Sequence, residues 1–343
     1  MALRILMLDP ARMPAWDAFV ASHPHASFFH QSAWRDVIAE GFGHTPHYLC
    51  AEQDGAIAGI LPLAHVKSAL FGNRLVSVPF CVEGGPLAAD EATRAALEQA
   101  AIDLMDKTGA GFVELRDAVE AASPWTSQRD LYVSFRKPIA ADDEANLKAI
   151  PRKQRAMVRK GMQYGLTSAV HRDAAALHRI YAESVRNLGT PVFARRYFAL
   201  LLERFGAQAD ILSVIDGEEP IASVLNFHFR DQVLPYYGGG TARARERAGN
   251  DFMYWEVMRR AAHRGARLFD FGRSKIGTGA HAFKRNWGFE PTPMHYRYRL
   301  KPGEAVPEIN PLNPKYRVFI AAWKRLPLPV ANTIGPILAR GLG

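Results

Sequence analysis

The sequence predicts an α/β fold class with α+β character, in which two tandem domains each contain a mixed sheet with helices on its faces. Three observations support this prediction. With 343 residues the chain is too long for one typical core and suits two domains of roughly 150 residues each. The same order of expected helices and strands occurs twice, and a strongly basic segment lies between the two occurrences.

The first occurrence runs from about residue 28 to residue 117. Its expected elements are a helix at 32–43, a strand at 47–53, a turn at Asp54–Gly55, a strand at 56–66, a helix at 92–109 and a strand at 111–117. An Asp–Gly pair between two apolar stretches is a strong hairpin signal, because the turn needs positive φ angles.

The second occurrence runs from about residue 177 to residue 273. Its expected elements are a helix at 195–206, a strand at 210–215, a turn at Asp216–Gly217, a strand at 220–230, a helix at 251–265 and a strand at 267–273. Glu114 and Asp270 are expected at the same place in the last strand of each half. The expected organisation is an N-terminal domain at 1–147, a basic connecting helix at 148–165, a C-terminal domain with the active site at 166–302 and a tail at 303–343.

The composition, 48% hydrophobic and 22% charged, is ordinary for a soluble globular protein. No apolar run reaches the roughly 18 residues that span a bilayer. The N-terminal apolar stretch is broken by Asp9 and Pro10 and lacks a signal-peptide cleavage pattern. We therefore expect a cytoplasmic protein.

The metal-binding residue types show no ligand spacing. Cys50 and Cys81 are expected to be structural, because a free cysteine behaves mostly as a small hydrophobe. Five histidines occur early in the chain, at His23, His25, His30, His44 and His47. No carboxylate shares a helix with them at ligand spacing, so polar loop or cap roles are expected and no metal site.

The net charge of +9 favours polyanionic partners, and the positive charge gathers at 148–165. Pro151 can begin a helix there. The cations of this segment are Arg152, Lys153, Arg155, Arg159 and Lys160. One interpretation is a solvated helix face. The other is a phosphate-binding arm, in which Arg152, Lys153 and Arg155 act beside a helix N-terminus whose amides also attract anions.

The segment FDFGRSKIGTGAHAFKRNWGFEP at 269–291 resembles the C-terminal signature of FemAB-type proteins, specifically the branch associated with exosortase/PEP-CTERM systems. YYGGG at 236–240 and the basic segment 148–165 match as well, and the resemblance runs from about residue 26 to residue 300. It implies two GNAT-like domains and the transfer of an amino acid from aminoacyl-tRNA to the peptide of a cell-wall precursor. The helical hairpin that some members insert for tRNA is not visible in this sequence.

The residue types in segment 269–291 also indicate a chemical role independently of the resemblance. Gly277 and Gly279 belong to a Gly-rich loop that leads into a helix and can present N–H groups to an anion. Arg273 and Lys275 add positive charge nearby. Lys284, one turn into the helix, is the candidate catalytic residue, because a cation there can stabilise the oxyanion of an acyl transfer. The alternative is a surface lysine on a short helix.

Three further candidates each have two interpretations. Asp270 alternates with Phe269 and Phe271, so it is either a buried, hydrogen-bonded strand residue or a base near the site. Tyr236 and Tyr237 stand beside a Gly-rich turn, where they either line a substrate cleft or pack a core.

The segment 241–252 stands where a CoA-dependent GNAT protein places its pyrophosphate loop. Its spacing departs from the usual Arg/Gln-x-x-Gly-x-Gly/Ala, which disfavours acyl-CoA as the donor. The arginines of the segment remain candidate phosphate ligands. Asn250 or Asp251 is a candidate cap of the following helix.

The tail mixes apolar residues with Lys324, Arg325 and Arg340, and its prolines are expected to interrupt any helix. It has three interpretations: a position on a membrane interface, packing onto the body of the protein, or disorder.

We expect a transferase that moves an aminoacyl or acyl group onto an amine of a peptidoglycan or exopolysaccharide precursor. No nucleophile motif is present, so direct attack by the amine is expected. The donor would be aminoacyl-tRNA or acyl-CoA, with no further cofactor. The expected partners are a phosphorylated or lipid-linked envelope precursor, tRNA, and the inner face of the membrane as a peripheral contact. The alternatives are a CoA-dependent GNAT N-acyltransferase and a non-catalytic protein that binds a phosphorylated glycan through the basic segment.

Overall fold

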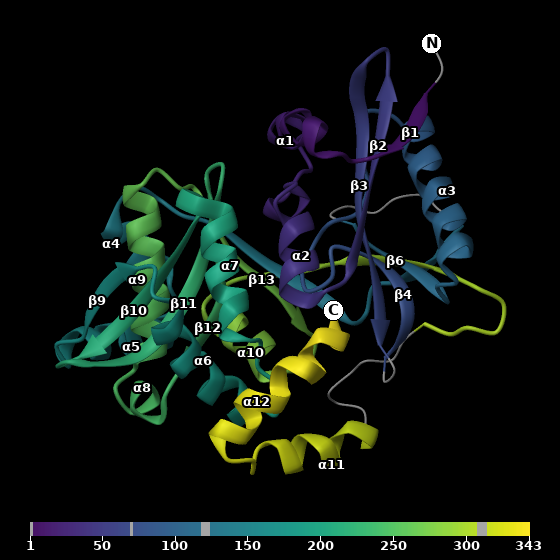
Figure 1. Cartoon of the computed structure of the whole chain (residues 1–343). Coiled ribbons are helices and arrows are strands. Elements are labelled where there is room, and N and C mark those ends of the chain that lie inside the picture. The colour runs from purple at the N-terminus through teal and green to yellow at the C-terminus, as the bar shows by residue number, and fades with distance from the viewer. Residues whose placement is uncertain (1–2, 69–70, 118–123, 307–313) are drawn as a thin grey trace. The chain divides into compact units, whose positions relative to one another are not determined.

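The computed structural model describes residues 3–68, 71–117, 124–306 and 314–343. The chain forms two compact units (Figure 1). The first unit consists of Met1–Asp130, Met294–Glu308 and Arg340–Gly343, and the second of Leu131–Pro293 and Ile309–Ala339.

The first unit contains a sheet with the strand order β1-β2-β3-β4-β6-β15-β7, with β5 paired to β3. Only the β4–β6 pair is parallel. Helix α3 covers one face, and α1 and α2 cover the other (Figure 1). The elements are β1 (Arg4–Met7), α1 (Met13–Ser22), α2 (Trp34–Phe42), β2 (Thr45–Gln53), β3 (Ala56–Ser68), β4 (Gly72–Ser77), β5 (Leu87–Ala88), α3 (Glu91–Thr108), β6 (Phe112–Asp117), β7 (Thr126–Gln128) and β15 (His295–Leu300).

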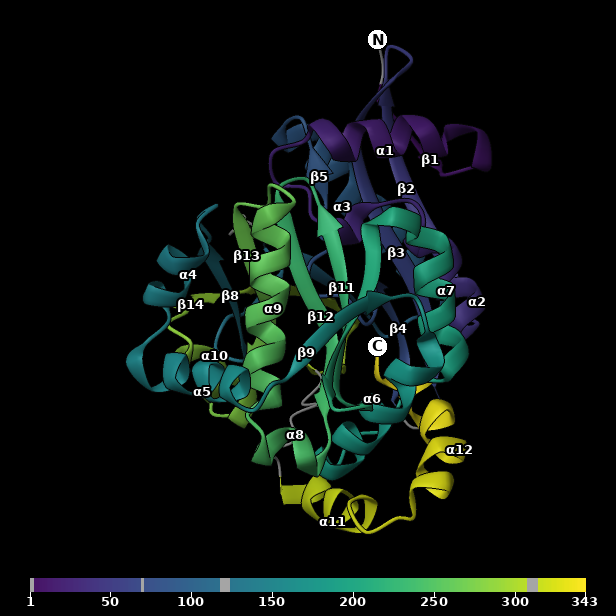
Figure 2. The ribbon, with the colours of Figure 1, turned by 90° about the vertical axis from the view of Figure 1, so that its left-hand side faces the viewer.

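The second unit contains a sheet with the strand order β14-β8-β13-β12-β11-β10-β9, in which only β12 and β13 are parallel. Helix α9 covers one face, and α6 and α7 cover the other (Figure 2). The elements are β8 (Tyr132–Pro138), α4 (Asp143–Ala149), α5 (Arg152–Gln163), β9 (Thr167–His171), α6 (Ala174–Leu188), α7 (Arg195–Phe205), β10 (Ala209–Asp216), β11 (Glu219–Phe229), β12 (Gln232–Gly240), α8 (Ala242–Glu246), α9 (Gly249–His263), β13 (Leu268–Lys275), α10 (Gly279–Asn286), β14 (Pro291–Pro293), α11 (Pro314–Trp323) and α12 (Leu328–Ala339).

The two sheets are built on one plan. Starting from β9, the second order is β9-β10-β11-β12-β13-β8-β14, which matches the first strand for strand. The hairpin β2–β3 corresponds to β10–β11, and the parallel pair β4–β6 corresponds to β12–β13. Glu114 and Asp270 are the third residues of the corresponding strands β6 and β13. The predicted repeat and the predicted α/β fold class are therefore confirmed.

The boundaries of the units differ from those expected at residues 147 and 302, because each sheet takes one strand from the other half of the chain. β8 follows the first unit in sequence but pairs with β13, from Leu268↔Pro138 to Lys275↔Tyr132. β15 follows the second unit but pairs with β6 along its whole length. Local sequence patterns do not predict this exchange of strands, because the pairing of β8 and β15 depends on which sheet edge each strand meets in the folded protein.

The two Asp–Gly turns use different residues as the turn. Asp54 and Gly55 have φ angles of 54° and 80°, and both lie between the paired residues Gln53 and Ala56. In the second hairpin Asp216 pairs with Glu219, so the turn consists of Gly217 and Glu218. Asp216 is therefore a buried strand residue, which the sequence pattern did not predict.

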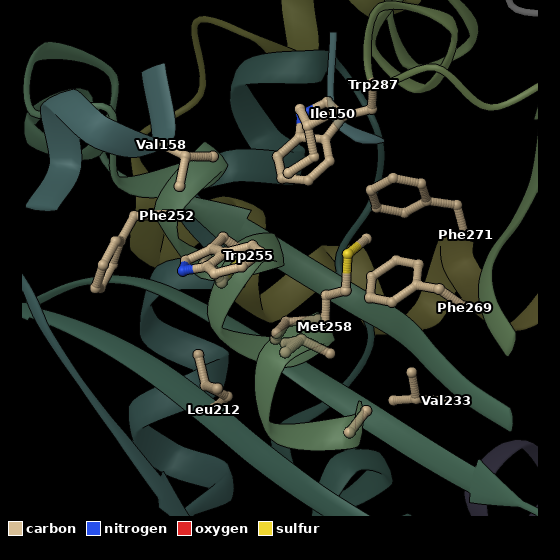
Figure 3. Packing of buried hydrophobic residues seen from close by; sticks show 14 of the residues in the cluster. Ile150, Val158, Leu212, Val233, Phe252, Trp255, Met258, Phe269, Phe271 and Trp287 are labelled. Atoms are coloured by element: carbon tan, nitrogen blue, oxygen red, sulfur yellow. The ribbon is translucent and has the colours of Figure 1, made fainter. Parts of the chain in front are cut away.

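The core of the second unit packs α9 against the sheet and α5 against α9 (Figure 3). Phe252, Trp255 and Met258 of α9 are joined in one cluster by Phe269 and Phe271 of β13. Helix α5 packs so closely against α9 that the contact requires a glycine in the basic segment. A Cβ at Gly161 would lie 2.8 Å from Cβ of Phe252, so only glycine fits there.

The C-terminal segment forms two helices rather than disordered chain in its described part. Trp323, Ala331 and Ala339 are buried, and α12 contacts α6. Pro336 lies inside α12 and does not end it, contrary to the expectation from the prolines. No helix among the described residues is long and apolar enough to cross a membrane.

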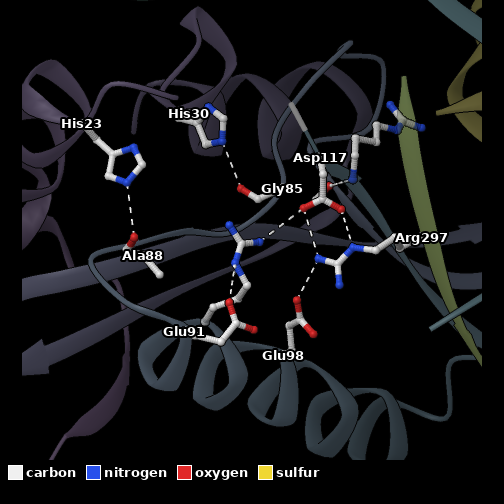
Figure 4. Close-up of polar contacts among 11 residues, drawn as sticks. His23, His30, Gly85, Ala88, Glu91, Glu98, Asp117 and Arg297 are labelled. Carbon is white, nitrogen blue, oxygen red and sulfur yellow. Dashed lines mark hydrogen bonds and ion pairs between the residues drawn. The ribbon is translucent and has the colours of Figure 1, made fainter. Parts of the chain in front are cut away.

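A buried ion network joins β15 to α3 and β6 in the first unit (Figure 4). The Arg297 guanidinium donates to both carboxylate oxygens of Asp117, at 2.7 and 3.1 Å, and to Oε1 of Glu98 at 2.7 Å. All three side chains are buried. The two carboxylates raise the pKa of Arg297 above its usual value despite burial.

We predict that Arg297→Met destabilises the first unit by about 3–5 kcal/mol, because buried Glu98 loses the cation at 2.7 Å and buried Asp117 keeps only Arg94, at 3.6 Å. Chemical denaturation monitored by tryptophan fluorescence measures this change. Arg299→Met, at an exposed position of the same strand, is the matched control and is expected to have little effect. Adding Glu98→Gln and Asp117→Asn to Arg297→Met should restore part of the loss. Equal stabilities of the Arg297 and Arg299 variants would contradict the prediction.

Candidate functional site

The parallel strands β12 and β13 separate soon after they begin to pair. Only Gln232↔Leu268 and Val233↔Phe269 are in register, although β12 continues to Gly240 and β13 to Lys275. Beyond these pairs the two strand edges have backbone groups that are not shared between them. A ligand's amide or carbonyl groups can hydrogen-bond to such edges.

A β-bulge in β13 lies beside this opening. The pairing with β8 shifts between Asp270 and Arg273, and Gly272 has a φ of 65°, which favours glycine. The Asp270 carboxylate accepts a 2.6 Å hydrogen bond from the Gly272 amide and a 2.8 Å bond from Nε of Arg136. Each carboxylate oxygen of Asp270 therefore accepts one hydrogen bond that stabilises the bulge. Of the two interpretations of Asp270, the geometry favours the buried, hydrogen-bonded strand residue over the base.

Lys284 is attached to the same bulge. Its Nζ donates to the carbonyls of Gly272 and Arg273, at 3.1 and 2.9 Å, and lies 5.6 Å from the ring centroid of Phe135. Burial lowers the pKa of Lys284 to about 8, while Asp270 acts in the opposite direction. Lys284 is therefore a half-buried, oriented cation and not the surface lysine of the alternative interpretation. Two of its three protons are committed to the backbone, and one remains for a ligand.

The bulge places the other two predicted cations on the opposite face of the sheet. The Arg273 guanidinium and Nζ of Lys275 lie over the Tyr132 ring, at 4.7 and 5.4 Å from its centroid. Tyr132 and Phe135 are three residues apart in a regular strand, so their side chains point to opposite faces. Lys284 is on the Phe135 face. The sequence-predicted cluster of Lys284, Arg273 and Lys275 is thus divided by β13.

The glycines of YYGGG are required by close packing. A Cβ at Gly239 would lie 2.6 Å from Cβ of Ser184 in α6, and one at Gly240 would overlap Oδ1 of Asn250 at the start of α9. Tyr237 is buried in an aromatic cluster, where its hydroxyl lies 2.9 Å from that of Tyr197. It packs the core in this structure. Tyr236 is half-buried at a second bulge, between Pro235 and Tyr237, and stays a candidate for ligand contact.

Gly277 and Gly279 are at the start of α10, as the sequence pattern predicted. Gly277 has a φ of 80° in the turn after β13, and Thr278 caps the helix by accepting from the amide of His281. A Cβ at Gly279 would meet no atom within 4 Å, so this position is open.

The segment after β12 differs from an open phosphate loop. Arg243 and Arg247 both donate to Oδ2 of Asp216, at 2.6 and 3.0 Å. Ala248 and Gly249 at the start of α9 are buried. Arg243, Arg247 and the first residues of α9 are therefore not arranged as an open pyrophosphate site, whereas Arg245 of the same segment is exposed.

Asp251 does not cap α9, contrary to the expectation from its position. Its Oδ1 accepts from Nε2 of Gln154 and from Nε1 of Trp287, both at 2.9 Å, and burial raises its pKa. The carboxyl group thus joins α5 and α9 to Trp287, which directly follows α10. This link holds the basic helix and the Lys284 helix on one framework.

Tyr254 is a candidate that sequence reasoning missed. Its ring lies 4.8 Å from that of Phe271 in β13, and its hydroxyl lies 3.4 Å from the place of a Cβ at Gly238 in β12. It therefore spans the two separating strands. Burial raises its pKa to about 12, so it keeps its proton at neutral pH. Its position in a helix rich in Trp and Met gave no signal that distinguished it from a core residue.

The basic helix α5 has one buried and one open face. Gln154, Val158 and Gly161 are buried toward α9. The opposite side is an open groove of about 500 Å³ lined by Arg152, Arg155, Ala156, Arg159 and Gln163. Lys153 is exposed outside the lining of this groove. The helix starts after Pro151, as predicted, and its N-terminus has no side-chain cap.

In the first unit, the chain's own segment at Gly84 and Gly85 lies beside the corresponding parallel strands β4 and β6. The amides of Gly84 and Gly85 donate to the carbonyl of Arg116, whose guanidinium donates to the carbonyls of Val78 and Cys81. A cavity of about 70 Å³ remains beside Gly85 and Ala88, where His23 and His30 bond to backbone carbonyls (Figure 4). His30 also completes a capping box with Ser27, one of the roles expected for the histidines.

The comparisons with known proteins agree with this fold. Residues 146–285 match the family model described as an acetyltransferase (GNAT) domain. The structure titled "Crystal structure of FemX" has a TM-score of 0.65 at 15% identity, covering 86% of this chain and 96% of that one. The structure of L-PGS from Bacillus licheniformis has a TM-score of 0.57 at 15% identity, covering 98% and 97%. A tandem GNAT protein from the clavulanic acid biosynthesis pathway has a TM-score of 0.53 at 14% identity, covering 88% and 100%. No curated protein sequence matches the chain.

The class that the fold and the site define is a tandem GNAT-fold protein. The matched segment contains the opening between β12 and β13, the bulge and Lys284, and the class of enzyme that it supports is an acyltransferase. FemX is among the structural neighbours, whereas the exosortase-associated branch stays a prediction from the sequence.

We predict that Gly240→Ala destabilises the second unit by about 1–3 kcal/mol, because the added methyl group would lie 2.9 Å from Cβ of Ala244 and would also displace the Asn250 side chain. Gly279→Ala is the matched control with open surroundings, and its stability should equal or slightly exceed that of the unchanged protein. Thermal unfolding of the two variants measures the difference. Similar melting temperatures would show that YYGGG is not constrained by packing.

Proposed function

We propose that the protein transfers an aminoacyl group onto an amine of a cell-envelope precursor, with the chemistry at the opening between β12 and β13. The observation that carries this proposal is the oriented Lys284 ammonium at the bulge where these strands diverge. A fixed donor at the edge of an unpaired strand segment is suited to a carbonyl group that gains negative charge during the reaction.

In the proposed reaction, the acceptor amine attacks the carbonyl carbon of the donor ester directly. The C–N bond forms, the C–O bond to the leaving group breaks, and the amine proton is transferred to the leaving oxygen. The free N–H of Lys284 stabilises the oxyanion, and its bonds to Gly272 and Arg273 keep its direction fixed. Tyr254, which keeps its proton throughout, would donate a hydrogen bond to the leaving oxygen while that oxygen takes the amine proton.

Two observations favour an aminoacyl-tRNA donor over acyl-CoA. The start of α9 is buried, and the nearby Arg243 and Arg247 are paired with Asp216, so a CoA pyrophosphate has no open site there. The groove on α5 offers three arginines, at residues 152, 155 and 159, to a longer polyanion. The FemAB resemblance supports the same donor class and an amine of a phosphorylated or lipid-linked peptidoglycan or exopolysaccharide precursor as acceptor.

The CoA-dependent N-acyltransferase is the second candidate, because the matching family model is that of an acetyltransferase domain. Incubation with a cell-envelope extract and either charged tRNA or acyl-CoA, followed by mass spectrometry of the extract, separates the two. Mass additions equal to an amino-acid residue support the proposal. Acylation from CoA alone would replace it with the second candidate, and no product from either donor would favour a non-catalytic glycan-binding protein.

We predict that Lys284→Met lowers kcat about a hundredfold or more while changing KM less, because a bond made in the transition state is lost. Methionine keeps the stem packed on Phe135 and Phe271, which alanine would not. Lys284→Arg should restore activity only in part, since a planar guanidinium cannot make the same three bonds. Unchanged kcat in a folded Lys284→Met protein would remove Lys284 from the mechanism.

The pH profile gives a second readout of the same assignment. A lysine with a pKa of about 8 loses its charge as the pH rises through 8, so kcat of the unchanged protein should fall above that pH. Lys284→Arg should lack this alkaline decline. Lys275, whose pKa burial also lowers to about 8, is the matched control, and Lys275→Arg should keep the decline. The reverse result would assign the titrating group to Lys275.

We predict that the triple variant of Arg152, Lys153 and Arg155 to Ala weakens binding of tRNA, used as the polyanion probe. The slope of log affinity against log salt concentration is negative. Its magnitude should decrease by about two to three in the variant, since each lost phosphate contact releases one counterion fewer. The charge-matched control changes the exposed Arg4, Lys107 and Arg299 to Ala. Equal affinities and slopes for the two triple variants would make α5 a solvated helix face.

A further inference from the structure

The C-terminal helices α11 and α12 lie at the edge of the second unit (Figures 1 and 2). Both helices expose apolar side chains. The exposed large hydrophobic residues of this region are Leu188 at the end of α6 and Val318, Phe319, Val330, Ile334 and Ile337 on the two helices. These six are more than half of the eleven large hydrophobic side chains that are exposed in the described residues. Such a concentration on a folded protein marks an interaction surface.

The apolar residues of α12 form two separate faces. Ala331, Gly335 and Ala339 recur every four residues and are buried. A Cβ at Gly335 would lie 3.0 Å from the backbone nitrogen of Val192, which shows how closely this face approaches the body of the unit. The other face presents Val330, Ile334 and Ile337, the last of which is 73% exposed. The helix is therefore firmly docked and still apolar on its outer side.

Helix α11 is fixed in a similar way. Trp323 is buried, and a Cβ at Gly189 would lie 2.5 Å from Cγ2 of Ile320, so the end of α6 and α11 are in close contact. The Arg186 guanidinium donates to the carbonyl of Leu326 in the connection between the helices, at 3.3 Å. Val318 nevertheless stays 79% exposed. Its exposure results from the direction of the docked helix.

The charge of residues 309–343 indicates what kind of partner would bind this surface. Residues 309–343 contain no Asp or Glu, and their cations are Lys315, Arg317, Lys324, Arg325 and Arg340. Arg317, Lys324 and Arg325 are exposed on α11 and directly after it. A second copy of the chain would bring like charges together on such a surface. An anionic lipid surface instead accepts the apolar residues in its interface and attracts the cations.

We propose that α11 and α12 form a docking surface for an anionic bilayer, with both helices lying in the interface plane and Lys324 and Arg325 near the lipid phosphates. This position would keep the protein at the membrane without a spanning segment. The proposal rests on the exposure and charge of these helices and does not require the proposed transfer reaction, so either can fail without the other.

Co-sedimentation of the whole chain with vesicles tests the proposal. Vesicles of phosphatidylcholine with about 30% phosphatidylglycerol should bind the protein, and pure phosphatidylcholine vesicles should bind it much less, because surface charge adds to the apolar term. The variant Val318→Ser/Ile337→Ser should reduce the partition coefficient about tenfold. Met7→Ser/Val170→Ser, which removes two exposed apolar side chains elsewhere, is the matched control and should bind unchanged.

Lys324→Gln/Arg325→Gln should reduce binding to the anionic vesicles about tenfold or more and leave the weak binding to neutral vesicles unchanged. Far-UV circular dichroism verifies that each variant is folded. The proposal is overturned if the unchanged protein does not bind anionic vesicles. It is also overturned if binding is lost with the α5 triple variant but kept by the tail variants, or if light scattering shows that Val318 and Ile337 mediate self-association instead.

Discussion

The bulge in β13 is the constraint on which the candidate site depends. One extra residue in this strand against β8 requires a left-handed backbone at Gly272, and the Asp270 carboxylate holds the resulting kink through the Gly272 amide and Arg136. The carbonyls of Gly272 and Arg273 then accept from Lys284, so a half-buried lysine is kept in one direction. Without the bulge, Lys284 would lose both of its backbone partners.

The same bulge decides which groups can act together. It reverses the alternation of side chains along β13, so Phe271 belongs to the α9 face, while Arg273 and Lys275 stack on Tyr132 at the opposite face. Lys284 and Tyr254 both lie near Phe271 on the α9 face. A carbonyl group in the opening between β12 and β13 would meet Lys284, and the cations on the other face would attract an anionic part of the ligand.

The basic helix is part of the same framework. The buried Asp251 accepts from Gln154 in α5 and from Trp287 after α10, so the arginine groove and the Lys284 helix are fixed relative to α9. An acyl donor with a long polyanionic part needs both features, a phosphate-binding surface and an oriented cation, at a constant separation. Arg243 and Arg247, in the segment after β12, are instead paired with Asp216.

The sequence by itself determined the repeated helix and strand order, the basic helix after Pro151, and the Gly-rich start of α10, because each depends on residues that are adjacent in the chain. The tertiary structure decided which strands exchange between the two sheets, that Asp216 is a strand residue, and that YYGGG is a close-packing site for Ser184 and Asn250. It also separated Lys284 from Lys275. These outcomes depend on contacts between residues that are far apart in sequence and on a single bulge. The bulge reverses side-chain direction along β13, and the hydrophobic pattern of the sequence does not predict it.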